Sequence, residues 1–137
     1  MIILSVDLGK ARTGLAICDK TEMLASPLAQ IQEKNMEHLL DKISNVALAR
    51  EAEMIVVGLP KNMDGSEGES AQNAREFAAR LRERTGLLVR MQDERGTTIT
   101  AHNYLNATNT RGKKRKNVVD SVAATIILQN YLDSKNR

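Results

Sequence analysis

The sequence predicts an α/β fold in which helices cover both faces of a five-stranded mixed sheet, with the first three strands antiparallel. Three short apolar segments joined by short turns begin the chain, which is typical of an antiparallel meander. Apolar strands then alternate with amphipathic helical segments, which indicates right-handed parallel crossovers. The predicted order of elements is therefore β-β-β-α-β-α-β-α-α.

The first three strands are predicted from their apolar composition. Residues 2–7 (IILSVD) are typical of a buried strand, and the turn LGKARTG leads into a second strand at 14–18 (GLAIC). Residues 22–31 (EMLASPLAQI) are expected to form the third strand. Pro27 in this strand indicates a sheet edge or an irregularity, because proline cannot donate a ladder hydrogen bond.

The remaining elements follow from helical spacing and from apolar runs. Asn35 is the predicted N-cap of the first helix, in which Leu39, Leu40 and Ile43 recur at helical spacing. Residues 54–58 (MIVVG) are apolar and rich in β-branched side chains, which is typical of a strand buried on both faces. The further predicted elements are a helix at about 70–84, a strand at 87–92 and helices at about 97–106 and 118–132.

The composition limits the class of protein. A chain of 137 residues suffices for one core, and residues 1–137 are predicted to form a single domain. No apolar run approaches the ~20 residues that span a bilayer, and the N-terminal apolar run meets Asp7, which is unlike a signal peptide. A single cysteine, Cys18, offers neither an intramolecular disulfide nor a zinc site. We expect a cytoplasmic protein with no membrane partner.

The charge distribution favours an anionic partner. The formal net charge is +3, and residues 111–116 (RGKKRK) contain five cationic side chains, which attract phosphate. Aromatic residues make up only 2% of the chain, which disfavours a base-stacking platform of the single-strand-binding kind. If nucleic acid binds, we expect its phosphate backbone to supply most of the attraction.

Three acidic positions stand where the local pattern asks for apolar residues. Asp7 ends the first strand, Asp93 and Glu94 end the fifth, and Asp120 begins the apolar last helix. Buried carboxylates cost free energy unless they are paired or bind a cation, and ligands gather at the carboxyl ends of strands in open α/β sheets. We therefore expect Asp7, Glu94 and Asp120 to meet at one sheet edge. Such a site suits Mg²⁺ or Mn²⁺, as one or two ions.

Each acid also has a simpler interpretation. Asp7 could close its strand as a turn or cap residue, and Asp120 could be a helix N-terminal charge that the helix dipole favours. Asp93 and Glu94 face opposite sides of a strand, so the residue pattern leaves open which of them points into the site. Convergence of three acids on one edge, beside a basic segment, favours the shared site.

At these residues the sequence resembles the YqgF/RuvX family of candidate pre-16S rRNA nucleases, which are also described as similar to Holliday junction resolvases. Four motifs in order carry the resemblance over almost the whole chain: VDLGKARTGLA at 6–16, VVGLPKNMDGSEGESA at 56–71, DERGTT at 93–98 and KRKNVVDSVAATIILQNYL at 114–132. The resemblance implies an RNase H-like fold with Asp7, Glu94 and Asp120 as the acidic triad. It also implies cytoplasmic trimming of the 5′ end of precursor 16S ribosomal RNA. Gly96 departs from the family's usual bulky apolar residue, which loosens the strand-to-helix junction but removes no carboxylate.

Basic and amide side chains around the acids are candidate substrate contacts. Arg12 is expected to contact phosphate or to pair with a nearby carboxylate, and Arg95 is expected to pair with the acidic cluster or with a phosphate. The loop GLPKNMDGSEG could hold a phosphate through its backbone N–H groups, with Ser66 or Ser70 capping the next helix, or it is a flexible connection. The basic run before Asp120 is either a solvated surface or a mobile substrate clamp. The predicted nucleic-acid-binding residues are Lys10, Arg12, Lys61, Asn62, Arg95, Lys113, Lys114, Arg115 and Lys116.

A metal-dependent nuclease acting on structured RNA, such as precursor 16S rRNA, is the leading functional hypothesis. A resolvase acting on branched DNA is the second, and the two-fold symmetry of a four-way junction would favour a stable dimer over the monomer or weak dimer otherwise expected. A nucleic-acid-binding module with a residual acidic site is an alternative from another class. A phosphate-binding fragment of the actin and sugar-kinase type ranks last, because 137 residues are too few for its two-domain ATP cleft.

Overall fold

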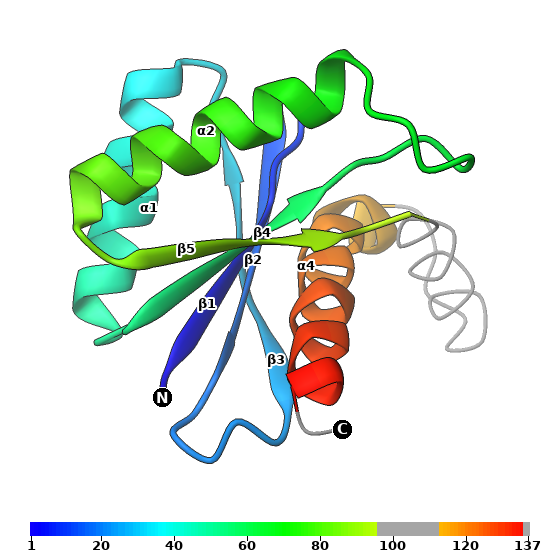
Figure 1. Cartoon of the computed structure of the whole chain (residues 1–137). Helices are drawn as coiled ribbons and strands as arrows, with labels where there is room; N and C mark the ends of the chain where they lie inside the picture. The colour runs from blue at the N-terminus through cyan, green and yellow to red at the C-terminus, as the bar shows by residue number, and fades with distance from the viewer. Residues whose placement is uncertain (96–112, 136–137) are drawn as a thin grey trace.

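Five strands form one mixed sheet in the order β3-β2-β1-β4-β5, in a computed structural model that describes residues 1–95 and 113–135 (Figure 1). β1 pairs antiparallel with β2, and β2 pairs antiparallel with β3. β4 pairs parallel with both β1 and β5. The predicted mixed sheet with an antiparallel start is therefore confirmed. The strands are β1 (Ile3–Asp7), β2 (Arg12–Cys18), β3 (Ala25–Gln32), β4 (Met54–Leu59) and β5 (Leu88–Asp93).

The outer strand β3 carries the irregularity that its proline predicts. Among the described residues, β2 is its only neighbour in the sheet, and the register shifts between the Leu15–Ala29 pair and the Ala16–Pro27 pair. An edge strand tolerates proline because one of its sides has no ladder to complete. β3 begins at Ala25 and not at the predicted residue 22, because Glu22 has a φ of 57° and belongs to the preceding turn.

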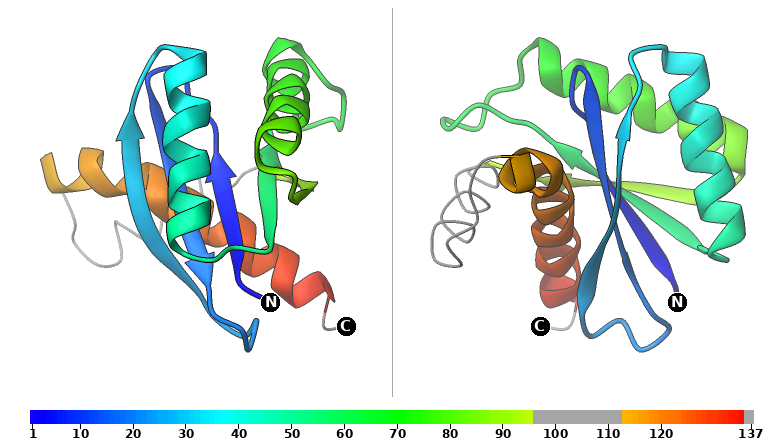
Figure 2. Two further views of the ribbon diagram at one scale, coloured as in Figure 1. Left: turned by 90° about the vertical axis from the view of Figure 1, so that its left-hand side faces the viewer. Right: turned by 180° about the vertical axis from the view of Figure 1, so that it is seen from behind.

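Helices lie on both faces of the sheet, as predicted (Figures 1 and 2). α1 (Met36–Ala49) and α2 (Glu69–Thr85) contact each other on one face, and α4 (Lys113–Lys135) packs across β1, β2 and β3 on the other. Asn35 caps α1 as expected, since its Oδ1 accepts a 3.0 Å hydrogen bond from the backbone N of His38. Within the described ranges, no helix has the length and apolar character needed to cross a membrane.

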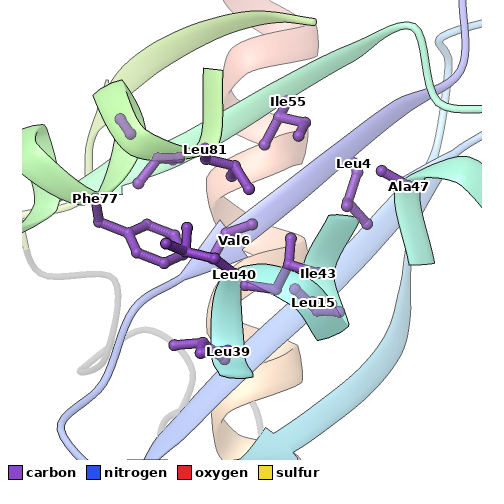
Figure 3. Packing of buried hydrophobic residues seen from close by; sticks show 12 residues of the cluster. Leu4, Val6, Leu15, Leu39, Leu40, Ile43, Ala47, Ile55, Phe77 and Leu81 are labelled. Atoms are coloured by element: carbon purple, nitrogen blue, oxygen red, sulfur yellow. The ribbon is translucent and has the colours of Figure 1, made fainter. Parts of the chain in front are cut away.

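Alternate residues of the central strands divide the core between these two faces. Leu4 and Val6 of β1 point towards α1 and α2, where they pack with Ile43 and Phe77 (Figure 3). Every residue of β4 is buried, so this strand is covered on both faces, as its composition predicts. The second layer of the core lies between the sheet and α4. It includes Ile3, Ala16, Met54 and Val56 from the strands and Ala124, Ile127 and Leu128 from the helix.

Two helix starts differ from the prediction. Gly68 is the N-cap of α2 and no side chain caps this helix, so the expectation for Ser66 or Ser70 is wrong. α4 begins at Lys113 and not at 118, because Lys and Arg are good helix formers and a charged run need not end a helix. The basic residues at 113–116 therefore open the helix instead of forming a loop before it. Their side chains and the predicted helix at 97–106 lie outside the described residues.

Candidate active site

The acidic site lies at the sheet edge where the parallel strands β1, β4 and β5 end. Asp7 is the last residue of β1, and Glu94 directly follows β5. β4 separates these strands, and at this level it contributes Gly58, which follows the Val6–Val57 pair. A Cβ atom on Gly58 would lie 2.7 Å from Oε2 of Glu94. The missing side chain therefore leaves the space in which Glu94 reaches across β4 towards Asp7.

Asp7 and Glu94 are joined by a hydrogen bond, so two carboxyl groups share one proton. Burial, together with the negative charge of Asp7 and the hydrogen bond to it, raises the pKa of Glu94 to about 9. Burial also raises the pKa of Asp7; the hydrogen bond from Glu94 opposes this rise, and the charge of Asp120 adds to it. At neutral pH and without a cation, Glu94 therefore holds the shared proton.

Asp120 reaches this edge because α4 lies directly against β1 and β2. Asp7 pairs with Gly14 of β2, and the backbone carbonyl of Asp120 occupies the space that a side chain on Gly14 would need. Oγ of Ser5 donates a buried 2.8 Å hydrogen bond to the carbonyl O of Ala124. Gly14 thus sets how closely α4 approaches the sheet, and Ser5 holds the helix against β1.

Asp120 has a cationic neighbour of its own. Nε of Arg12 lies 3.3 Å from Oδ2 of Asp120. This oxygen is buried and accepts no hydrogen bond from the part of the chain that the structure describes. Burial raises the pKa of Asp120, while the charge of Arg12 opposes the rise. Of the two alternatives for Arg12, the structure shows the pairing with a carboxylate.

The three acids fit a hard divalent cation chemically. They offer only oxygen donors, which Mg²⁺ and Mn²⁺ prefer, and a cation would relieve the repulsion that raises the pKa of Asp7. Across residues 1–95 and 113–135, however, no three Asp, Glu, His or Cys side chains are already placed around one ion position. The fold brings Asp7 and Glu94 into contact and places Asp120 beside them. That all three act as ligands stays a prediction.

Glu94, and not Asp93, faces the acidic site. Asp93 pairs with Arg95, whose Nη2 lies 2.8 Å from Oδ2 and whose backbone N donates a 2.9 Å hydrogen bond to Oδ1. Nη1 of Arg95 also donates a 3.5 Å hydrogen bond to the carbonyl O of Met63. Arg95 therefore pairs with Asp93 and not with the expected acidic cluster, and it links the end of β5 to the loop after β4.

The loop between β4 and α2, residues 60–68, is closed by its own hydrogen bonds. The backbone N of Asn62 donates to the carbonyl O of Ser66 at 2.8 Å, and Nδ2 of Asn62 donates to Oγ of Ser66 at 2.9 Å. The backbone N and Oγ of Ser66 both donate to Oδ1 of Asp64, at 2.9 and 2.6 Å. These bonds favour a defined turn over the flexible connection considered for this segment.

The other predicted contact residues surround the same sheet edge. Lys10 is exposed in the turn between β1 and β2, and Lys61 is half-buried at the start of the loop. The backbone of residues 113–116 forms the start of α4. The side chains of Lys113, Lys114, Arg115 and Lys116 lie outside the described residues, so their contact with substrate stays a prediction.

Gly58 and Ser5 are positioning residues that the sequence analysis did not identify. Gly58 interrupts a β-branched strand, where an isolated glycine often marks a close approach of another group. Ser5 is a polar residue in a buried strand, and a buried hydroxyl group requires a hydrogen-bond partner. Both signals are present in the sequence, but neither identifies the partner.

A known family and named relatives match this chain over nearly its whole length. The family described as RuvX, Holliday junction resolvase, matches residues 1–134. A protein of Halothermothrix orenii is 42% identical over 137 residues, which cover 100% of this chain and 98% of the relative. A protein of Nitrosospira multiformis is 39% identical over 133 residues, which cover 97% of this chain and 88% of the relative. Both relatives are provisionally named as pre-16S rRNA nucleases.

Two solved structures share the fold at low sequence identity. The fowlpox virus resolvase, in complex with Holliday junction DNA, has a TM-score of 0.64 at 13% identity and covers 100% of both chains. RuvC of T. thermophilus, in complex with a Holliday junction substrate, has a TM-score of 0.62 at 11% identity, covering 99% of this chain and 96% of that one. These likenesses show the fold, which is RNase H-like.

Proposed function

The chain belongs to the RuvX family, and from that membership and its acidic site we propose that it is a metal-dependent nuclease hydrolysing phosphodiester bonds. The observation that carries the proposal is the contact of Asp7 and Glu94 in the space left by Gly58, with Asp120 on the facing helix. Holding two half-buried carboxyl groups together is costly, and apolar residues would stabilise the fold at least as well. Such a cost is typical of a functional site.

We propose Asp7, Glu94 and Asp120 as the ligands of one or two Mg²⁺ or Mn²⁺ ions. When bound, a divalent cation supplies Lewis-acid stabilisation of the charge that develops on the phosphate during hydrolysis. Glu94 must first lose the proton that it shares with Asp7, so cation binding is coupled to proton release. Arg12 pairs with Asp120 in the absence of a cation. If a divalent cation neutralised Asp120, the guanidinium group of Arg12 could bind a substrate phosphate instead.

We propose structured RNA, the 5′ region of precursor 16S rRNA, as the substrate, with processing in the cytoplasm. The provisional names of the two relatives support this choice. The family description supports a second candidate, the four-way DNA junction. The exposed Lys10 and the basic start of α4 would attract the phosphate backbone of either nucleic acid.

Cleavage of both nucleic acids side by side tests the proposal. Purified protein is incubated with precursor 16S RNA or a four-way DNA junction, in Mg²⁺, Mn²⁺ or EDTA, and the product ends are mapped. We expect cleavage of the RNA near the mature 5′ end, only when a divalent cation is present. Asp7→Asn should slow cleavage by roughly 100-fold or more while sparing RNA binding, because several kcal/mol of charge stabilisation depend on the acidic site.

Asp133→Asn is the matched control, since Asp133 is an exposed acid near the C-terminal end of the helix that carries Asp120. This variant should cleave at the wild-type rate. Wild-type cleavage by Asp7→Asn would show that the proposed acidic site is wrong. Cleavage of the DNA junction alone would support the second candidate. Binding with no cleavage in either cation would favour a non-catalytic binding module.

A further inference from the structure

Met63 is an exposed apolar residue in the loop that follows β4, the strand between β1 and β5. It is 72% exposed in the loop between β4 and α2, which projects past the end of β4 in Figure 1. A single exposed apolar side chain is ordinary on a protein surface. Met63 requires a further explanation because of how its loop is built and where that loop lies.

The backbone is fixed on both sides of Met63. The N of Gly65 donates a 2.8 Å hydrogen bond to the carbonyl O of Asn62, which closes a turn around Met63 and Asp64. Gly65 has a φ of 90°, a conformation that glycine adopts without strain. The bonds of Ser66 to Asn62 and Asp64 complete the loop. The turn therefore presents Met63 to solvent from a defined position.

Arg95 connects this turn to the end of β5, next to Glu94. Its Nη1 donates to the carbonyl O of Met63 at 3.5 Å, while its Nη2 pairs with Asp93. Arg95 is also the residue after Glu94, which is hydrogen-bonded to Asp7. The loop itself follows Leu59, whose carbonyl O accepts a 3.1 Å hydrogen bond from the backbone N of Glu94. The nucleotides next to a scissile phosphate at the acidic site would therefore pass this loop.

An apolar group held beside a phosphate-binding site matches one part of a nucleotide, the face of its base. Among the described residues, Phe77 and Tyr131 are the aromatic side chains, and both pack in or against the core. A thioether makes favourable contacts with aromatic rings, and methionine is among the apolar residues that insert between base steps. Resting on the proposed function, we propose that Met63 contacts the face of an unstacked base next to the scissile phosphate. It would thereby select substrates that are unpaired or distorted at that point.

Binding of labelled nucleic acid to a cleavage-deficient variant, Asp7→Asn, tests this contact. The probes are an RNA hairpin with a single-stranded 5′ extension and a four-way DNA junction, with 2-aminopurine at successive positions around the duplex end or branch point. Because 2-aminopurine fluoresces more strongly when it leaves the base stack, we expect binding to raise its fluorescence at one position. Adding Met63→Ala should remove most of this rise and weaken binding roughly three- to tenfold.

Two further substitutions in the Asp7→Asn background control the result. Met63→Leu keeps an apolar side chain of similar size and should retain most of the fluorescence rise. Met23→Ala is the matched control, because Met23 is 75% exposed in the turn between β2 and β3, at the opposite end of the sheet. The carbonyl O of Met23 also accepts a hydrogen bond, from Nε2 of Gln129 at 3.2 Å. Met23→Ala should change neither fluorescence nor affinity.

The outcomes separate this proposal from the proposed function. If the wild-type protein cleaves nucleic acid but Met63→Ala changes neither fluorescence nor affinity, the base contact is wrong and the nuclease proposal stands. If no cation supports cleavage but Met63→Ala removes the fluorescence rise, the base contact stands and the nuclease proposal fails. If the Asp7→Asn variant binds neither probe, both proposals are wrong.

Discussion

Glu94 carries a carboxyl group whose pKa lies well above neutral pH when no cation is bound, because it is half-buried beside the charge of Asp7. In the unfolded chain the same group would lose its proton near its ordinary pKa of 4.5. Between 4.5 and about 9 the folded protein thus binds a proton that the unfolded chain has lost. The contribution of Glu94 to stability is complete below the lower of these pH values and is lost as the pH rises through the upper one.

Glu94→Gln should weaken this pH dependence, because an amide does not titrate. In EDTA, we compare the free energy of unfolding of the variant with that of the wild type. The difference in favour of the variant should grow by about 1–3 kcal/mol between pH 5 and pH 8. Urea unfolding near pH 5 and near pH 8 measures the difference. Glu76→Gln, which removes an exposed carboxylate of α2, should keep the wild-type slope. Equal slopes for Glu94→Gln and the wild type would contradict the raised pKa.

At the scale of the elements, two glycines on the strands that flank β1 control different parts of the site. The backbone of α4 fills the space beside Gly14 of β2, whereas the ends of the Glu94 and Ile127 side chains fill the space beside Gly58 of β4. A helix backbone can withdraw only if the whole helix shifts, but the end of a side chain can rotate. The same added methyl group should therefore have different effects at the two positions.

Gly14→Ala should lower the free energy of unfolding by about 1–3 kcal/mol, since the clash is with helix backbone, and should also lower activity as Asp120 moves with α4. Gly58→Ala should change stability by ~1 kcal/mol or less but greatly slow cleavage, because it displaces the carboxyl group of Glu94. Urea unfolding and cleavage rates measured on the same preparations test this contrast. Wild-type stability of Gly14→Ala, or wild-type activity of Gly58→Ala, would contradict it.

The boundary of a helix or strand could be predicted where the hydrogen bond that fixes it joins residues only a few positions apart. Asn35 caps α1 as predicted, because the N–H group that it accepts from is three residues away. The same reasoning failed for Ser66, whose N–H and hydroxyl groups are already bonded to Asp64 inside the loop, which leaves α2 without a side-chain cap. A polar residue near a helix start is thus an ambiguous signal, because turns and caps compete for it.

At the scale of the whole molecule, no single segment contains the site. Asp7 ends β1, Glu94 follows β5 after β4 has come between them, and Asp120 belongs to the helix on the opposite face from α1 and α2. β1 is covered on both faces, by the layer under α1 and α2 and by the layer under α4. Assembly of the acidic site therefore requires the complete sheet and both helical layers, so ligand binding at the site should stabilise the fold as a whole.

Mg²⁺ or Mn²⁺ should raise the melting temperature of the protein, because an ion that binds only the folded acidic site stabilises it against unfolding. The shift should be on the order of 5–10 °C when the ion exceeds its dissociation constant by about 100-fold. It should grow with pH as Glu94 loses its proton. Scanning calorimetry with and without the ion measures it, and Asp7→Asn should abolish the shift while Asp133→Asn keeps it. A wild-type protein unaffected by either ion would contradict the proposed ligands.

The sequence by itself determined the class of fold and the placement of Asp7, Glu94 and Asp120 at the ends of strands or near the start of a helix. Strand and helix periodicities record which side of each element faces water, so they predict layers and the edge of the sheet. The edge position and the irregularity of β3 could also be predicted, because Pro27 cannot donate a hydrogen bond to a neighbouring strand.

Only the tertiary structure decided which of these groups touch. The choice of Glu94 over Asp93, and its contact with Asp7, depend on the register of three parallel strands and on the missing side chain of Gly58. The pairing of Arg12 with Asp120 depends on where α4 crosses β2. These are distances between segments far apart along the chain, and local residue patterns carry no information about such distances.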